Sequence, residues 1–112
     1  MGRYIVDGNP PIWHSAAEYT LQQTDAELKA APGSGKYLYV TDIVIICNAA
    51  VTVTLEQGTT TTKFKHYADG QGSGISAHFL TPMKLADNTS LTLTTSAAVT
   101  VFVLAAGYVA TG

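Results

Sequence analysis

The sequence predicts an all-β protein: an antiparallel β-sandwich of jelly-roll-like type, preceded by an extended N-terminal arm. From Lys36 onward, short segments alternate an apolar residue with Thr or Ser, which is the period of a half-buried antiparallel strand. Turn residues separate these segments at spacings of about 8–12 residues, as they do in sandwiches and jelly rolls. We therefore expect seven or eight strands and little helix.

The chain length and composition predict one domain that associates with other proteins. The 112 residues suffice for a single domain, which we divide into an arm over residues 1–35 and a sandwich over residues 36–112. Only 12% of residues are charged, about half the usual share, and Thr and Ser take their place. Such a surface is weakly protected against association, which suits a subunit of an oligomer or larger particle.

Residues 1–35 lack the alternation that follows them. Asn9-Pro10-Pro11 favours extended backbone, and a short strand is expected at Arg3–Asp7. The segment Thr24–Ala31 has the sequence of a short capped helix. Ile12 and Trp13 need an apolar surface to pack on, either the sandwich of the same chain or a neighbouring subunit.

The first predicted strand covers residues 36–47 and changes phase in its middle. Apolar residues occupy even positions up to Val40 and odd positions from Ile43, so a β-bulge is expected at Thr41-Asp42. The segment 60–67 is more polar and carries two lysines, which predicts an exposed edge strand. Further on, Pro82 is expected to break the strand that begins near Ile75.

The last predicted strand, Ala98 to Val109, is apolar on both faces. Val99, Val101 and Val103 share one face, and Phe102, Leu104 and Ala106 share the other. One face packs on the core, and the other needs a second cover, from the arm or from another subunit. The residues expected at an oligomer or capsid interface are Ile12, Trp13, Tyr37, Tyr39, Val101, Phe102 and Leu104.

No catalytic, cofactor or metal site is predicted. His14, His66 and His78 lie in different segments without metal-ligand spacing, and no Ser/His/Asp set can be identified. Cys47 ends an apolar run and is expected to be a buried apolar residue. The net charge of −2 argues against direct nucleic-acid binding, and no apolar stretch is long enough for a membrane helix.

Exposed aromatic residues leave one alternative open. A carbohydrate-binding domain presents aromatic rings on one sheet face, and Tyr37, Tyr39, Tyr67 and Tyr108 are candidates for this role. Tyr37 and Tyr39 share a face of one strand, where tyrosines also pack against neighbouring side chains.

Residues 35–109 resemble small virion proteins of tailed bacteriophages. The resemblance lies in a long first strand, the V-T-V-T-L strand at Val51–Leu55, a glycine-rich loop at 69–74, and F-x-x-P-x-x-L from Phe79 to Leu85. It continues through L-T-L-T-T-S-A-A from Leu91 and ends in Gly107-Tyr108. These are strand and turn patterns without active-site chemistry. They imply a jelly-roll or related sandwich that cements or decorates a capsid, often as a homotrimer.

The function expected from this resemblance is that of a structural virion protein, not an enzyme. Its partners would be other copies of itself, as a homotrimer, and the major capsid protein. It would be made in the cytoplasm of a bacterial host, consistent with the single cysteine, and would lie on the outer capsid surface. The alternative is a tail or receptor-binding domain that binds carbohydrate.

Overall fold

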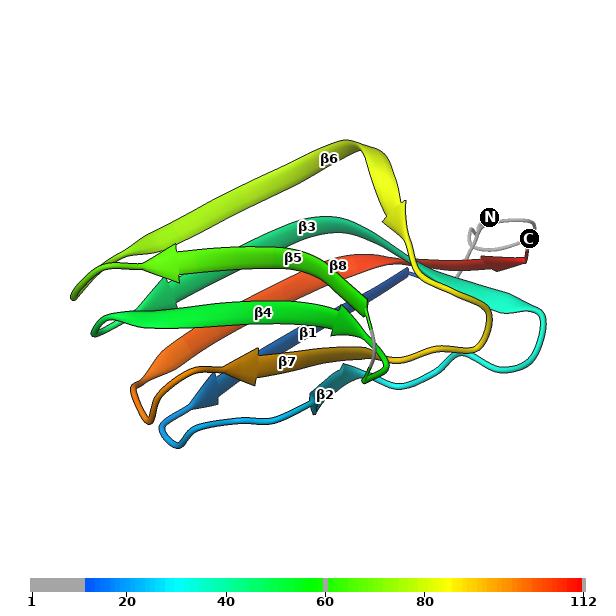
Figure 1. Ribbon diagram of the computed structural model, residues 1–112. Coiled ribbons are helices and arrows are strands. Elements are labelled where there is room, and N and C mark those ends of the chain that lie inside the picture. The colour runs from blue at the N-terminus through cyan, green and yellow to red at the C-terminus, as the bar shows by residue number, and fades with distance from the viewer. Residues whose placement is uncertain (1–11, 60, 112) are drawn as a thin grey trace.

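The protein is a sandwich of two antiparallel sheets (Figure 1). The computed structural model describes residues 12–59 and 61–111, and within them it contains eight strands and no helix, hence no helix that could cross a membrane. The all-β sandwich expected from the sequence is confirmed. The strands are β1 Ile12–Tyr19, β2 Ala26–Lys29, β3 Lys36–Cys47, β4 Val51–Gln57, β5 Thr61–Ala68, β6 Gly74–Lys84, β7 Leu91–Thr95 and β8 Val101–Thr111.

The strand order is that of a jelly roll. Sheet A has the order β1-β8-β3-β6 and sheet B the order β2-β7-β4-β5. The first strand pairs with the last, the second with the seventh, the third with the sixth, and the fourth with the fifth, all antiparallel. This is the pattern obtained when one long antiparallel hairpin is rolled across two sheets, as in an eight-stranded jelly roll.

Residues 12–29 are part of the sandwich, which corrects the prediction of an arm over residues 1–35. β1 pairs with β8 along all of its eight residues and forms one edge of sheet A. β2 pairs with β7 and forms one edge of sheet B. The sequence suggested otherwise because the apolar periodicity of these strands is weak and β2 has only four residues. The strand expected at Arg3–Asp7 lies outside the described residues.

The short helix predicted at Thr24–Ala31 is replaced by β2. The backbone of Asp25 has a positive φ of 53°, and its N–H donates to the Thr94 hydroxyl of β7 at 3.0 Å. Leu28 then enters the core, where it is only 7% exposed. A helix of two turns is marginal on its own, so the tertiary contacts of β2 outweigh the local helix signal.

The predicted bulge in β3 is confirmed, whereas the predicted break at Pro82 is wrong. The pairing of β3 with both neighbouring strands shifts register between Val40 and Asp42. Opposite this bulge, β6 runs through residues 79–82 without pairing to β3 and then resumes pairing at Met83. Figure 1 shows the resulting bend in β6. Because β6 is an edge strand, Pro82 can lie within it at a place where β6 makes no pairing to β3.

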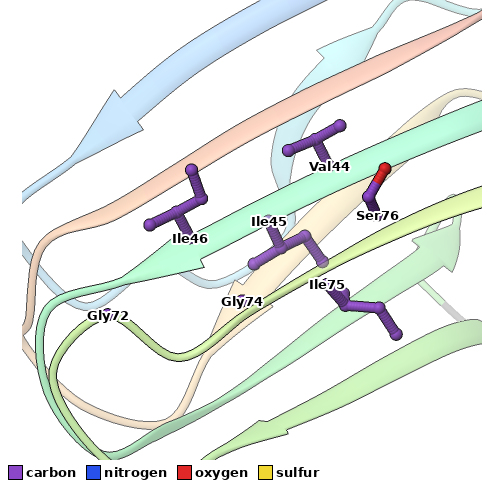
Figure 2. A pocket seen from close by; sticks show the side chains of 7 residues that line it. All are labelled: Val44, Ile45, Ile46, Gly72, Gly74, Ile75 and Ser76. Atoms are coloured by element: carbon purple, nitrogen blue, oxygen red, sulfur yellow. The ribbon is translucent and has the colours of Figure 1, made fainter.

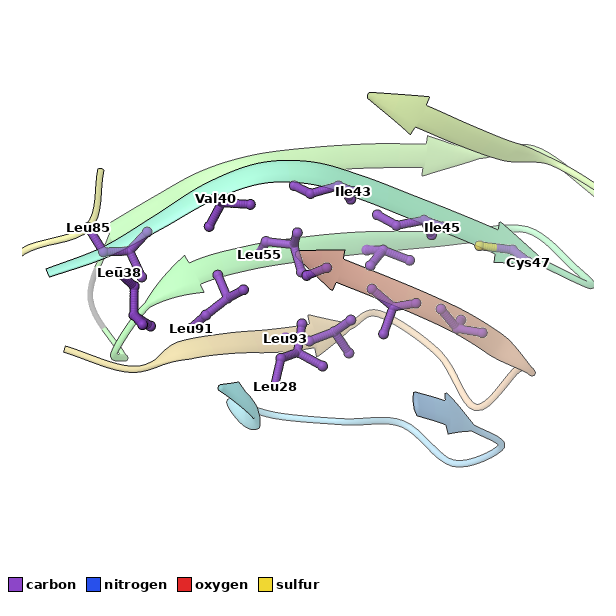
Figure 3. Packing of buried hydrophobic residues seen from close by; sticks show 14 of the residues in the cluster. Leu28, Leu38, Val40, Ile43, Ile45, Cys47, Leu55, Leu85, Leu91 and Leu93 are labelled. Carbon is purple, nitrogen blue, oxygen red and sulfur yellow. The ribbon is translucent and has the colours of Figure 1, made fainter. Parts of the chain in front are cut away.

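The core lies between the sheets and is built from the inward residues of each strand (Figure 3). Alternate residues of β3 and β8 are fully buried, as are those of β4 and β7. Cys47 is 1% exposed and burial raises the pKa of its thiol, which fits its predicted role as a buried apolar residue. On the β5–β6 side, Phe64 and Phe79 meet edge to face with ring centroids 6.1 Å apart.

Candidate interaction surface

The outer face of sheet B is polar. Threonine occupies the outward positions of β4 and β7, and the flanking strands contribute Lys65 and Glu27. The Thr94 hydroxyl lies 2.8 Å from Glu56 Oε1, within hydrogen-bonding distance. The outward side chains of sheet B are thus mostly polar, with Tyr67 of β5 as an exposed aromatic among them.

The outer face of sheet A, called the A face below, is apolar over half of its length. The cross-strand register aligns its outward residues in rows, one residue from each strand. Phe102 and Leu104 are partly buried, and Ile46 is 49% exposed. Two of these rows are mainly apolar. Read from β1 to β6, the first is Ala16, Leu104, Val44 and Ser76, and the second is Glu18, Phe102, Ile46 and Gly74.

The A face is an outer surface within the described part of the chain. Residues 12–59 and 61–111 form only two layers, so none of their segments lies over this face (Figure 1). A contiguous apolar surface of this kind is typical of an interaction site. The outer face of sheet B has no comparable apolar rows, because its outward positions on β4 and β7 are threonine and glutamate.

A shallow depression adjoins the apolar rows at the β6 edge. It has a volume of about 350 Å³ and is lined by Val44, Ile45, Ile46, Gly72, Gly74, Ile75 and Ser76. Figure 2 shows Val44, Ile46 and Ser76 projecting to the same side of the sheet. A side chain at Gly74 would be too close to the backbone, since its Cβ would lie 2.6 Å from the Ile45 carbonyl oxygen. Glycine at this position therefore allows the close approach of β6 to β3.

A ladder of aromatic rings crosses the other end of the A face. The rings of Tyr39 and Tyr108 are stacked, with centroids 4.8 Å apart and planes 7° from parallel. The Lys84 ammonium lies 5.8 Å from the Tyr39 centroid and 4.2 Å from the Tyr37 centroid. Tyr108 and Lys84 lie on the strands either side of β3, so the Tyr39 ring has a neighbour on each side. A sugar that stacks on an aromatic ring needs a free ring face.

A hydrogen-bonded pair of side chains, Asp42 and His78, lies in the middle of the A face. His78 Nδ1 is 2.7 Å from Asp42 Oδ1, and the Thr41 hydroxyl donates to Asp42 Oδ2 at 2.8 Å. The hydrogen bond from His78 lowers the pKa of the Asp42 carboxyl, and the bond from Thr41 lowers it further. His14 lies in the same row, with Ala106 of β8 between it and Asp42. No group of three His, Cys, Asp or Glu residues suited to a metal ion occurs among the described residues.

The structure separates the predicted interface residues into two groups. Trp13 and Val101 lie in the core, where they are 6% and 0% exposed. The others occupy outward positions on sheet A: Ile12, Tyr37, Tyr39, Phe102 and Leu104.

Ala16, Val44 and Ile46 also belong to the A face but were not predicted there. For Val44 and Ile46 a signal was present, because the run Ile43–Ile46 is apolar at every position, like the last strand. Such a run indicates a strand that is covered on both faces.

No protein-family model and no curated protein sequence matches the chain. Among solved structures, the chain is similar to one titled "Capsid of Ralstonia phage GP4", with a TM-score of 0.47 and 13% identity. That alignment covers 99% of this chain and 93% of the other. A second similarity is to a virus-like particle of the extra small virus of the giant freshwater prawn Macrobrachium rosenbergii. Here the TM-score is 0.41 and the identity 16%, over 96% of this chain and 83% of the other. The jelly-roll assignment itself rests on the strand order.

Proposed function

We propose that the protein is a structural component of a virus particle, a capsid cement or decoration subunit that binds the assembled phage head and stabilises it. The observation that carries this proposal is the contiguous apolar A face on a sandwich whose opposite face is polar. The jelly roll is a frequent architecture of capsid proteins, although it also occurs in lectins and cupins, so the fold alone does not assign the function. The resemblance of residues 35–109 to small virion proteins of tailed phages favours the capsid role.

The finer features of this proposal come from the same resemblance. They are a homotrimeric state, the major capsid protein as second partner, a position on the outer surface of the virion, and synthesis in the cytoplasm of a bacterial host. In this role the protein acts by binding to its partners over a large contact area, and not by catalysing a reaction. It binds the assembled lattice and not the free capsid protein, so binding shifts the equilibrium towards the assembled state. Many copies on one lattice turn a weak contact into a strong one.

A heat-release experiment tests the proposal. Purified capsids that lack the protein are mixed with it, and the temperature at which they open is compared with that of untreated capsids. We expect the protein to bind and to raise this temperature. Leu104→Asp on the A face should abolish both effects, whereas Thr54→Asp on the outer face of sheet B should not. Absence of binding and of any shift would exclude the cement role.

The carbohydrate-binding alternative, in a tail or receptor-binding protein, has one observation in its favour: Tyr67 of β5 is 71% exposed. The tyrosines on the A face support it less, because the Tyr39 ring is flanked by Tyr108 and Lys84. Binding on a glycan array that is lost in Tyr67→Ala would favour this alternative over the capsid role.

A further inference from the structure

We infer that edge strand β6 pairs with β6 of a second copy of this chain, antiparallel and about a two-fold axis at Ala77, so that sheet A continues from one copy into the next. The contact is made at the edge of sheet A and leaves its outer face free. The pairing rests on the proposed structural role and deepens it, because the A faces of both copies then lie on the same side and can bind a capsid together.

The first part of β6 is the least protected of the four sheet edges that residues 12–59 and 61–111 form. Natural edge strands avoid pairing with other chains through short length, charged side chains, prolines or bulges. β2 has only four residues and an irregular register, β5 carries Lys63 and Lys65, and β1 carries Glu18. Residues 74–80 of β6 contain no Asp, Glu, Lys, Arg or Pro. This stretch therefore has the features of an edge that accepts another strand.

The backbone groups that face the free edge of β6 follow from the pairing of β3. The N–H and the carbonyl of Cys47 both bond on the β6 side, to the chain just before β6, at 2.8 Å. Successive residues of a strand direct these groups to opposite sides, so Ile45, two residues earlier, also bonds towards β6, where its partner is Ile75. The same alternation directs the backbone groups of the even-numbered residues of β6 to the free edge: Gly74, Ser76, His78 and Leu80.

A two-fold axis at Ala77 matches these backbone groups and the side chains beside them. Each even-numbered residue of the stretch then lies opposite an even-numbered residue of the second copy, with which it can exchange two hydrogen bonds. Polar side chains meet polar ones, and apolar side chains meet apolar ones or glycine. The pairs, one residue from each copy, are Gly74 with Leu80, Ser76 with His78, and Ile75 with Phe79.

The neighbouring registers match less well. A shift of two residues in one direction sets His78 of each copy against His78 of the other and places Pro82, which has no N–H, opposite Gly74. The opposite shift places Leu80 opposite Gly72, which lies before the start of β6. The register about Ala77 is therefore the one that uses the whole stretch 74–80.

This register also places an exposed leucine beside an apolar depression. Leu80 is 94% exposed, the highest exposed fraction among the large apolar side chains of the described residues. The depression of about 350 Å³ at the β6 edge is lined by Val44, Ile46 and Gly74, among others. Leu80 lies about 20 Å along β6 from Gly74 of its own chain. Across the two-fold axis it lies opposite Gly74, where it can cover Ile46, so the pairing buries both leucines.

The axis of such a pair is perpendicular to the sheet, because antiparallel strands of one sheet are related by a rotation about its normal. The A faces of both copies therefore point in the same direction. A two-fold contact closes after two copies. Because it uses only one edge, the other surfaces remain available for the homotrimer implied by the family resemblance. Two A faces in one particle also bind a capsid more tightly than one.

Leu80→Asp with sedimentation equilibrium of the full-length chain tests the contact. Leu80 is exposed, so the variant should stay folded by circular dichroism. Its dissociation constant should rise by roughly a hundredfold or more, because each pair would place two carboxylates at apolar sites. Leu21→Asp is the matched control, since Leu21 is 69% exposed and lies outside the strands, and it should keep the wild-type mass. A wild-type mass in Leu80→Asp would overturn the pairing.

Ala77→Cys tests the register. Ala77 meets its counterpart in a non-hydrogen-bonded pair, whose Cα atoms lie about 4.5 Å apart, within the range of a disulfide. Mild oxidation should link this variant into a covalent dimer, whereas Cys47 is 1% exposed and should not react. Thr81→Cys, four positions along the same strand, should stay unlinked. Linking of both variants, or of neither, would contradict an axis at Ala77.

The outcomes separate the pairing from the proposed function. A monomeric wild-type chain that binds capsids and raises their opening temperature would overturn the pairing and leave the structural role standing. If that monomer lost capsid binding in Leu80→Asp, a strand of the capsid protein would occupy the edge in place of a second copy. A dimer that Leu80→Asp dissociates but that binds no capsid would keep the pairing and contradict the proposed function.

Discussion

Trp13 of β1 lies against Gly107 of β8, and this contact exists because Gly107 has no side chain. The two residues are direct partners in the pairing of β1 with β8. A Cβ at Gly107 would lie 3.1 Å from Trp13 Cζ2 and 1.7 Å from the Tyr39 carbonyl oxygen. One glycine thus allows the close approach of β3 and β8 and leaves space for the indole ring.

Gly107→Ala should destabilise the protein by about 3 kcal/mol or more. Its methyl group would meet the β3 backbone, which cannot yield like a flexible side chain, and overpacking of a core costs about 1–3 kcal/mol even where neighbours can adjust. Urea unfolding followed by circular dichroism measures this change. Gly70→Ala is the matched control, because no atom lies within 4 Å of a Cβ there. Equal stability of the two variants would contradict the contact.

Trp13→Ala should cost about 3–5 kcal/mol, because it leaves a large cavity in the core. Trp13→Phe should cost much less. It keeps an aromatic ring and removes an indole N–H that is buried and has no hydrogen-bond partner among the described residues. Thermal unfolding of both variants tests this order.

Deletion of residues 1–22 removes all of β1 and should prevent folding. If these residues formed a separate arm, the sandwich would fold without them. A folded deletion variant would show that β1 is dispensable.

Two adjacent residues of β8 should respond differently to the same substitution. Val101 is 0% exposed in the core, so Val101→Asp buries an unpaired charge and should unfold the domain. Phe102 points outwards on the A face, so Phe102→Asp should leave a folded chain that no longer binds capsids. Circular dichroism and co-sedimentation with capsids together separate the two outcomes. If Phe102→Asp still binds capsids, the A face is not the contact.

The pH response of the Asp42–His78 pair follows from the lowered pKa of Asp42. A carboxyl with a lowered pKa in the folded state adds stability above its ordinary value of 3.8, and this is lost as the pH falls through the folded-state value. His78→Ala should raise the Asp42 pKa towards 3.8, because it removes the largest cause of the shift. Carboxyl-carbon NMR titration measures this directly. His14→Ala should leave the Asp42 titration unchanged, and an unchanged value in His78→Ala would exclude the pair.

Much of the sandwich could be predicted because its strands carry their own periodicity. Val51–Leu55 and Leu91–Thr94 alternate strictly and lie in β4 and β7. The bulge at Thr41-Asp42 was visible as a phase change, because one extra residue reverses the faces of all the residues that follow it. Part of the A face could also be predicted, because the last strand is apolar on both of its faces.

The errors fell where local signals and tertiary contacts disagreed. The helix signal at Thr24–Ala31 was outweighed by the pairing of β2 with β7 and the burial of Leu28. Pro82 stays within β6 because an edge strand needs partners on one side only. In both cases the residues that pair with the mispredicted segment, or with its immediate neighbours, lie more than 35 residues away along the chain.

The sequence by itself determined the class of this protein, an all-β chain with low charge, no catalytic constellation and one strand apolar on both faces. These properties follow from side-chain period and composition, which are local. Only the tertiary structure decided the jelly-roll strand order, the inclusion of β1 and β2 in the sheets, and the division of the apolar residues between core and A face. These depend on which distant strands pair and in which register, because a shift of one residue moves every side chain of a strand to the opposite face.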